Sequence, residues 1–152
     1  MRVLVDTNIL ARAAQLTHSM SVSASQATNE LAKRGEELIC IPQICYEFWV
    51  VATRPAQANG LGMDTQSVTS ELVRLQQAMT FLNDPPSLFK EWFTLVKQYA
   101  IIGKRAHDAR LVAAMHLHQI SHILTLNPQD FQNFAGITVL TPADVLSSSS
   151  TP

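Results

Sequence analysis

The chain has very little cysteine and no long hydrophobic run, and these two features exclude several classes of protein. Cys40 and Cys45 are its only cysteines, too few for a disulfide framework or a cysteine-based zinc cluster. We expect both to be free, buried thiols in a reducing compartment. No apolar stretch approaches the ~20 residues that a membrane span needs, and the N-terminus lacks a signal-peptide pattern. We therefore expect a soluble, cytoplasmic protein with no membrane partner.

The chain also lacks an excess of positive charge. Its 11 Lys and Arg residues are matched by 12 Asp and Glu residues, for a net charge of -1. This balance argues against binding nucleic acid through a broad basic surface. It leaves open a nucleic-acid substrate held through metal ions and a few local cations. Neither the dinucleotide-binding pattern G-x-G-x-x-G nor the P-loop pattern is present, so those two chemistries have no support.

The sequence does contain short apolar runs that alternate with helical patterns. Expected strands lie at 2–6, 38–41, 122–125 and 137–140, and expected helices at 8–14, 24–34, 42–52, 65–82, 87–99 and 107–118. This alternation predicts an α/β fold with a mostly parallel sheet. The 152 residues fit a single domain, which we place at 1–146. We expect the Ser-rich segment 147–152 to be a disordered tail.

Two carboxylates lie at positions that are expected to be buried, where a charged side chain loses its hydration and destabilises the fold unless a cation lies beside it. Asp6 directly follows the first apolar run, at the strand end where open α/β sheets bind ligands. Glu47 lies in an expected helix with Ile44 and Val51 on its own face. The alternatives are that Asp6 only caps the next helix, and that Glu47 lies on one exposed stripe of a buried helix.

Two further acids lie at comparable positions. Asp108 stands near the start of the last expected helix, on its apolar face, and Asp130 follows the third expected strand. A helix cap and a turn residue are the respective alternatives. Gathered together, the four carboxylates would repel one another. A hard cation such as Mg²⁺ or Mn²⁺ removes that repulsion and supports hydrolysis of phosphate esters.

The ordered set of motifs resembles the PIN-domain family, and most closely the VapC-like toxins of bacterial toxin–antitoxin pairs. The motifs are Val-Leu-Val-Asp6-Thr-Asn8, Glu47 in the helix after the second strand, His107-Asp108-Ala-Arg-Leu-Val-Ala, and Ile-Leu-Thr125-Leu-Asn127-Pro-Gln-Asp130-Phe. The resemblance implies a three-layer α/β/α sandwich with a central parallel sheet and metal-dependent ribonuclease activity. It also implies a homodimer and inhibition by a small antitoxin.

The resemblance also implies roles for individual residues. The matches to the family's three main metal-binding acids are Asp6, Glu47 and Asp108, and Asp130 matches a further catalytic acid. The matches to its polar, site-orienting residues are Thr7, Asn8 and Thr125. Asn127 stands where many relatives have another Asp, so we expect one firmly held metal and a second only with substrate.

Three cations flank Asp108, namely Lys104, Arg105 and Arg110. They are candidates for phosphate contacts, and a solvated helix start is the alternative. The helical segment 64–99 resembles the family's region that packs protomers together or lines the substrate groove. Plain core packing is the alternative for this segment.

We therefore expect a Mg²⁺- or Mn²⁺-dependent endoribonuclease, the toxin of a toxin–antitoxin pair, that leaves 5′-phosphate and 3′-hydroxyl ends. Single-stranded or loop RNA is the expected substrate, because proteins read bases mainly in such segments. One alternative is a non-catalytic PIN-like module that binds RNA or a protein partner. Another is a phosphatase with Asp6 as nucleophile, which would require a second Asp where Asn8 stands.

Overall fold

The computed structural model describes residues 1–148 and has a five-stranded parallel sheet in the order β3-β2-β1-β4-β5. The strands are β1 (Arg2–Val5), β2 (Glu37–Cys40), β3 (Thr80–Phe81), β4 (His122–Leu124) and β5 (Thr138–Leu140). The apolar run at the start of the chain forms the central strand β1, in which Val3 pairs with Leu38 of β2 and with His122 of β4. Val3 to Val5 are fully buried, as expected for a parallel strand covered on both faces.

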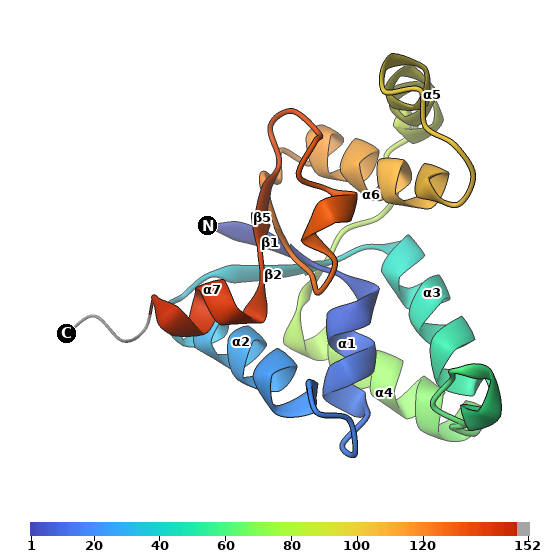
Figure 1. Ribbon diagram of the computed structural model, residues 1–152, viewed down its shortest axis with the longest axis vertical. Helices are drawn as coiled ribbons and strands as arrows, with labels where there is room; N and C mark the ends of the chain where they lie inside the picture. Colours follow the sequence, from blue (N-terminus) through green and yellow to red (C-terminus); the bar gives the residue numbers. More distant parts are fainter. Residues whose placement is uncertain (149–152) are drawn as a thin grey trace.

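Helices cover both faces of the sheet (Figure 1). They are α1 (Thr7–Ala14), α2 (Ser21–Lys33), α3 (Pro42–Thr53), α4 (Thr65–Ala78), α5 (Leu88–Gln98), α6 (Arg105–Leu117) and α7 (Pro142–Ser147), with 3-10 turns η1 (Ala56–Ala58) and η2 (Pro128–Asp130). The pair α5 and α6 packs on one face, and the other helices pack on the opposite face. The predicted three-layer α/β/α sandwich is confirmed. Within residues 1–148, no helix has the length and apolar character needed to cross a membrane.

The edge strand β3 was not predicted from the sequence. The helix expected to run to Leu82 ends at Ala78, and Met79 has the extended backbone angles φ -128 and ψ 157. Thr80 and Phe81 then pair with β2, and the Leu82 N–H donates to the Cys40 carbonyl at 3.0 Å. The error has a simple cause: apolar residues at helical spacing continue past the helix end, and two residues are too few to show strand alternation.

Two helices begin earlier than their apolar spacing indicates. The helix expected from residue 24 begins at Ser21 as α2. In the same way the helix expected from residue 107 begins at Arg105 as α6, and its N-cap is Lys104. Polar first turns carry little apolar periodicity, so the pattern starts later than the helix. Asp108 therefore lies inside the first turn of α6 and is not its cap.

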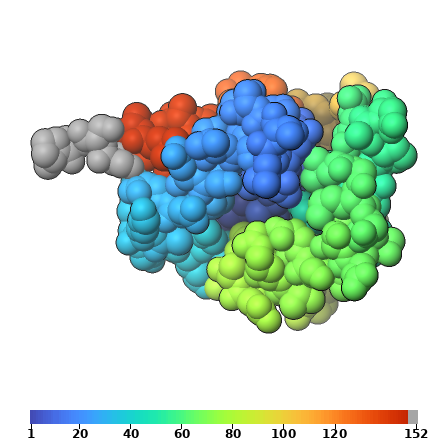
Figure 2. Space-filling model, turned by 90° about the horizontal axis from the view of Figure 1, so that it is seen from below, coloured from blue at the N-terminus to red at the C-terminus, as the bar shows by residue number. Residues whose placement is uncertain are grey.

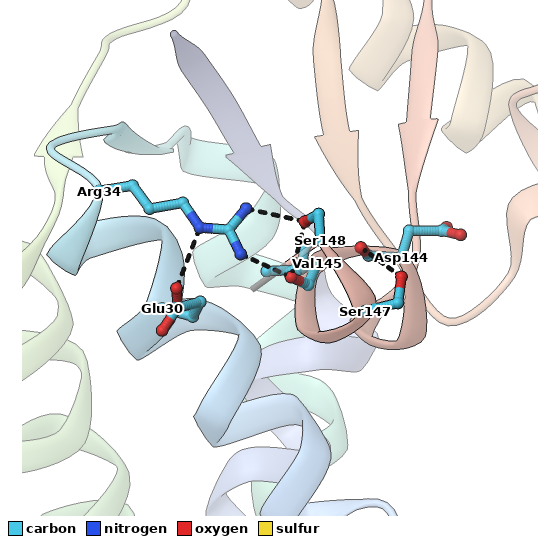
Figure 3. Close-up of polar contacts among 6 residues, drawn as sticks. All are labelled: Glu30, Arg34, Asp144, Val145, Ser147 and Ser148. Carbon is cyan, nitrogen blue, oxygen red and sulfur yellow. Dashed lines mark hydrogen bonds and ion pairs between the residues drawn. The ribbon is translucent and has the colours of Figure 1, made fainter. Parts of the chain in front are cut away.

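The C-terminal helix α7 was not predicted, although Thr141 and Asp144 form a capping box and Pro142 stands at its first position. Arg34 ties α7 to the end of α2 (Figure 3). The Arg34 guanidinium donates to the Glu30 carboxylate at 3.0 Å, to the Val145 carbonyl at 2.7 Å and to the Ser148 hydroxyl at 2.9 Å. These bonds satisfy carbonyl and hydroxyl groups at the end of a short helix that lacks further turns to do so.

The start of the expected Ser-rich tail is therefore part of the fold. Ser147 ends α7 and Ser148 is its C-cap. Viewed from below, α7 (red) lies beside α2 (light blue) in Figure 2. The remainder of the expected tail, 149–152, lies outside the described residues.

The two cysteines meet where β2 leads into α3. Both are free thiols, with their sulfur atoms 3.6 Å apart. Cys40 is buried as predicted, whereas Cys45 is only half-buried. The hydrogen bond from Cys40 lowers the pKa of the Cys45 thiol.

Candidate active site

A cleft opens at the carboxyl ends of the two central strands β1 and β4. The chain leaves β1 toward β2 on one side and leaves β4 toward β5 on the other, which makes the β1–β4 boundary a topological switch point. The cleft has a volume of about 1090 Å³. The predicted site residues that line it are Asp6, Thr7, Asn8, Glu47, Lys104, Asp108, Arg110, Asn127 and Asp130. Thr125 and Arg105 are not among the lining residues.

Asp6 is held by the end of the neighbouring strand. The buried Thr125 hydroxyl donates to Asp6 Oδ2 at 2.6 Å, and it accepts from the Asn8 amide at 3.1 Å and from the Asn127 N–H at 3.0 Å. Asp6 stands at the N-cap position of α1, yet its side chain makes no capping hydrogen bond there. The Asp6 carboxylate therefore belongs to the cleft rather than to the helix cap, and the hydrogen bond from Thr125 fixes its orientation.

Glu47 reaches the cleft from α3, and both of its oxygens are engaged. The Thr7 hydroxyl donates to Oε2 at 2.9 Å, and the Gln43 amide donates to Oε1 at 2.8 Å. The same Gln43 amide donates to the His107 carbonyl at 3.0 Å, which links α3 to α6. Glu47 is half-buried and lines the cleft, so it does not lie on a solvent-exposed stripe.

The acids influence one another electrostatically. Burial raises the pKa of Asp6 from 3.8 to about 6, with smaller upward contributions from Glu47 and Asp108 and downward ones from the hydrogen bonds of Thr125 and Thr7. Burial likewise raises the pKa of Asp108 from 3.8 to about 6; Asp130 and Glu47 add to this, while Arg105 and His107 oppose it. The four predicted acids thus belong to one electrostatic cluster.

The three predicted cations have different surroundings. Arg110 donates to the Gln43 carbonyl at 2.9 Å and to the Asp84 carboxylate at 2.6 Å. Arg105 donates to the Asp130 backbone carbonyl at 2.8 Å, so it braces the η2 turn that carries this acid. Lys104 is exposed at the cleft. Contacts of these side chains with phosphate remain a prediction.

The comparisons with known proteins are at the level of structure. No protein-family model and no curated protein sequence matches this chain. A chain of the VapBC2 complex from Rickettsia felis, bound to a DNA fragment from its promoter, matches with TM-score 0.68 at 15% identity, covering 93% of this chain and 98% of that chain. Such VapBC assemblies contain PIN-domain toxins. The chain has the PIN-domain fold.

Two further structures agree with this assignment. VapC20 from Mycobacterium tuberculosis, described as a sarcin–ricin loop cleaving toxin, matches with TM-score 0.64 at 14% identity over 89% of this chain and 98% of that chain. FitAcB from Neisseria gonorrhoeae matches with TM-score 0.61 at 16% identity over 93% of this chain and 98% of that chain. The resemblance read from the ordered sequence motifs is confirmed, because these matches show the PIN fold over nearly the whole chain.

Sequence reasoning missed several residues at the PIN cleft, among them Gln43, Arg12 and Arg54, which line it, and Asp84, which lies beside it. Gln43 is 5% exposed and joins Glu47, Arg110 and the backbone at His107. Its signal was available, because it lies four residues before Glu47 on the same helical face. Asp84 pairs with Arg110 from the segment after β3; it had no local signal, since the strand before it was itself missed.

The donor chemistry of the PIN cleft fits a hard divalent cation. Asp6, Glu47, Asp108 and Asp130 offer carboxylate oxygens, the ligands that Mg²⁺ and Mn²⁺ prefer. Their mutual repulsion is of the kind that a bound cation relieves. In the arrangement seen, no three His, Cys, Asp or Glu side chains among residues 1–148 stand close enough together to hold a metal ion. Binding would therefore draw the carboxylates inward.

Proposed function

We propose that this chain is a Mg²⁺- or Mn²⁺-dependent endoribonuclease, the toxin of a toxin–antitoxin pair. The observation that supports this most is the convergence of acids from four separate elements on one cleft of a PIN fold. Two of these acids have pKa values raised to about 6. An acid cluster at the switch point of a sheet has no structural purpose that outweighs its electrostatic cost.

The metal would be held by Asp6, Glu47 and Asp108, with Asp130 beside them. When bound, such a cation lowers the pKa of water and stabilises the charge that develops on a phosphodiester. The protein keeps Asp6 oriented through Thr125 and Glu47 oriented through Thr7 and Gln43. These hydrogen bonds limit the orientations that the two carboxylates can adopt, so that a small inward movement on cation binding would complete the site. The products would carry 5′-phosphate and 3′-hydroxyl ends.

Substrate positioning falls to the cations at the cleft. Lys104 and Arg54 are exposed at the cleft and are the candidates for phosphate contacts, whereas Arg110 is already engaged by Gln43 and Asp84. With a net charge of -1, the protein depends on such local contacts and on the metal for RNA affinity. The description of VapC20 as a toxin that cleaves the sarcin–ricin loop supports RNA as the substrate class.

An antitoxin is the expected protein partner, and a homodimer the expected assembly. Support for the antitoxin comes from the matched structures, which include a toxin–antitoxin complex from Klebsiella pneumoniae with TM-score 0.55 at 19% identity. A small inhibitor that covers the cleft would keep the carboxylates from RNA. Co-expression with the product of a neighbouring reading frame, followed by co-purification, tests this partnership.

The nuclease proposal is tested by incubating a pool of single-stranded and structured RNAs with the protein in Mg²⁺, in Mn²⁺ and in EDTA. The key variant is Asp6→Asn, and the matched control is Asp64→Asn, because Asn replaces Asp well at the helix cap that Asp64 provides. We expect cation-dependent cleavage by wild type and by the control, and none by Asp6→Asn. Cleavage that persists in Asp6→Asn would refute the site. Absence of cleavage and of cation binding in wild type would favour the non-catalytic binding module.

A further inference from the structure

A second hollow, of about 550 Å³, adjoins the acid cleft. We call it the aromatic hollow; its lining residues are Leu88, Phe89 and Trp92 of α5, Ala106, His107 and Arg110 of α6, and Asp84 before α5. The negative charge of Asp84 is paired with Arg110 at 2.6 Å. His107 and Arg110 also line the acid cleft, so the two depressions share a wall. A ligand lying in the cleft can therefore extend into the hollow without leaving the surface.

The hollow presents aromatic ring surface. Phe89 is 70% exposed, an unusual exposure for so large an apolar ring. Its ring centroid lies 5.6 Å from that of Trp92 at an interplanar angle of 40°. The Trp92 indole N–H donates to the Ala106 carbonyl at 2.8 Å. The indole is thus fixed in place with its donor already used, and what it offers a ligand is its π surface.

The Phe93 ring, also on α5, has different surroundings. It stacks on Phe89 with centroids 5.9 Å apart and planes 7° apart, and the Lys97 ammonium lies 4.5 Å from its ring centroid. Phe93 is 47% exposed but does not line the hollow. The ring that lines the hollow is therefore Phe89, and the Phe93 ring beyond it already has the Lys97 ammonium over its face.

We propose that the aromatic hollow is a nucleobase subsite, in which a base of the RNA next to the cleaved phosphodiester stacks on Phe89 and Trp92. The inference rests on the proposed function of the acid cleft. RNA matches this surface in two respects: its bases have flat π faces that can stack on the rings of the hollow, and its charged backbone can lie in the adjoining cleft. Stacking of bases on aromatic side chains tolerates any base, and Arg110 at the shared wall lies where the backbone would pass from hollow to cleft.

A second copy of the chain is the rival occupant, because exposed aromatic surface also occurs in protein interfaces. Continuity of the hollow with the cleft favours RNA. The two occupants make different demands on α5. A protein interface would use the whole exposed face, Phe89 and Phe93 alike, whereas a base needs only the ring that lines the hollow.

The test uses the full chain with Trp49→Phe, which leaves Trp92 as the only tryptophan of the two in the sequence. Trp49 lies on α3 and lines neither depression. Asp6→Asn is added to this background so that no cleavage is expected, and a five-nucleotide single-stranded RNA is titrated in Mg²⁺ while Trp92 fluorescence is recorded. We expect the RNA to quench Trp92 fluorescence saturably, and we expect a much weaker response to an oligonucleotide of the same length whose sugars carry no bases.

The variants Phe89→Ala and Phe93→Ala, made in this background, separate the explanations. We expect Phe89→Ala to weaken RNA binding about tenfold and Phe93→Ala to leave it nearly unchanged. Equal quenching by normal and abasic RNA, unchanged affinity of Phe89→Ala, or no RNA binding at all would overturn the subsite. A lower molar mass of both variants in light scattering, with unchanged RNA affinity, would assign the surface to a second copy. The nuclease proposal is tested separately by cleavage of the RNA pool, so failure of the subsite can be distinguished from failure of the nuclease proposal.

Discussion

Replacing Asp6 by Asn should make the protein more stable at neutral pH. The Asp6 side chain is 7% exposed and its pKa is raised from 3.8 to about 6. Because one pKa unit corresponds to 1.36 kcal/mol, the ionised form costs the folded state up to about 3 kcal/mol. Asn keeps an oxygen that can accept the Thr125 hydroxyl and removes the charge. We expect Asp6→Asn to raise the free energy of unfolding by about 1–3 kcal/mol at pH 8.

The gain should depend on pH with a definite sign. A carboxyl with a raised pKa binds its proton more tightly in the folded state than in the unfolded state. Its contribution to stability is therefore fully present below pH 3.8 and is lost as the pH rises through about 6. The advantage of Asp6→Asn over wild type should accordingly be large at pH 8, smaller at pH 6 and nearly absent at pH 4.

Urea unfolding in EDTA at these pH values measures the difference, and thermal unfolding should show a shift of about 2–4 °C per kcal/mol for a chain of this length. The control Asp64→Asn should show no gain at pH 8, because hydrogen bonds from Ser67 lower the pKa of Asp64. If Asp6→Asn were no more stable than wild type at pH 8, or if its gain were the same at every pH, the electrostatic account of the cleft would be refuted.

Three further predictions concern the cleft and the fold. Gln43→Leu should cost about 1–2 kcal/mol in urea unfolding, because it removes hydrogen bonds to the partly buried Glu47 and Arg110. It should also slow RNA cleavage by loosening Glu47; an unchanged rate would show that Gln43 does not position this acid. The affinity for Mn²⁺ should fall as the pH drops through about 6, where protons compete with the cation for Asp6 and Asp108; an affinity unchanged from pH 8 to 5 would exclude these two acids as ligands. Arg34→Met should cost about 1–2 kcal/mol by releasing α7 while leaving the cleavage rate as in wild type; a large loss of activity would link α7 to the cleft.

The parts of the fold that could be predicted depend on local signals. The apolar run before Asp6 is short, continuous and bounded by polar residues, so its identity as a buried strand and the place of its last residue are both readable. Glu47 is conspicuous because apolar residues surround it in the sequence. The order of such motifs along the chain then indicated the PIN fold, which a single motif could not.

The parts that could not be predicted depend on contacts between distant segments. The strand β3 exists because two residues pair with β2, and nothing in their own sequence distinguishes them from the helix before them. Asp84 is 26 residues from Arg110 in the sequence, yet they form an ion pair at the edge of the cleft. The difference between Asp6 and an ordinary helix cap likewise arises from Thr125, which is 119 residues away.

Titration of Mn²⁺ into the protein by calorimetry at pH 7.5 tests most directly whether the converging acids form one metal site. Wild type, Asp108→Asn and the control Asp64→Asn are compared, since Asp108 has no capping role to confuse the result. The account predicts a saturable heat of binding for wild type and for the control, and its loss in Asp108→Asn. Binding that is unchanged in Asp108→Asn, or absent from wild type, would contradict it.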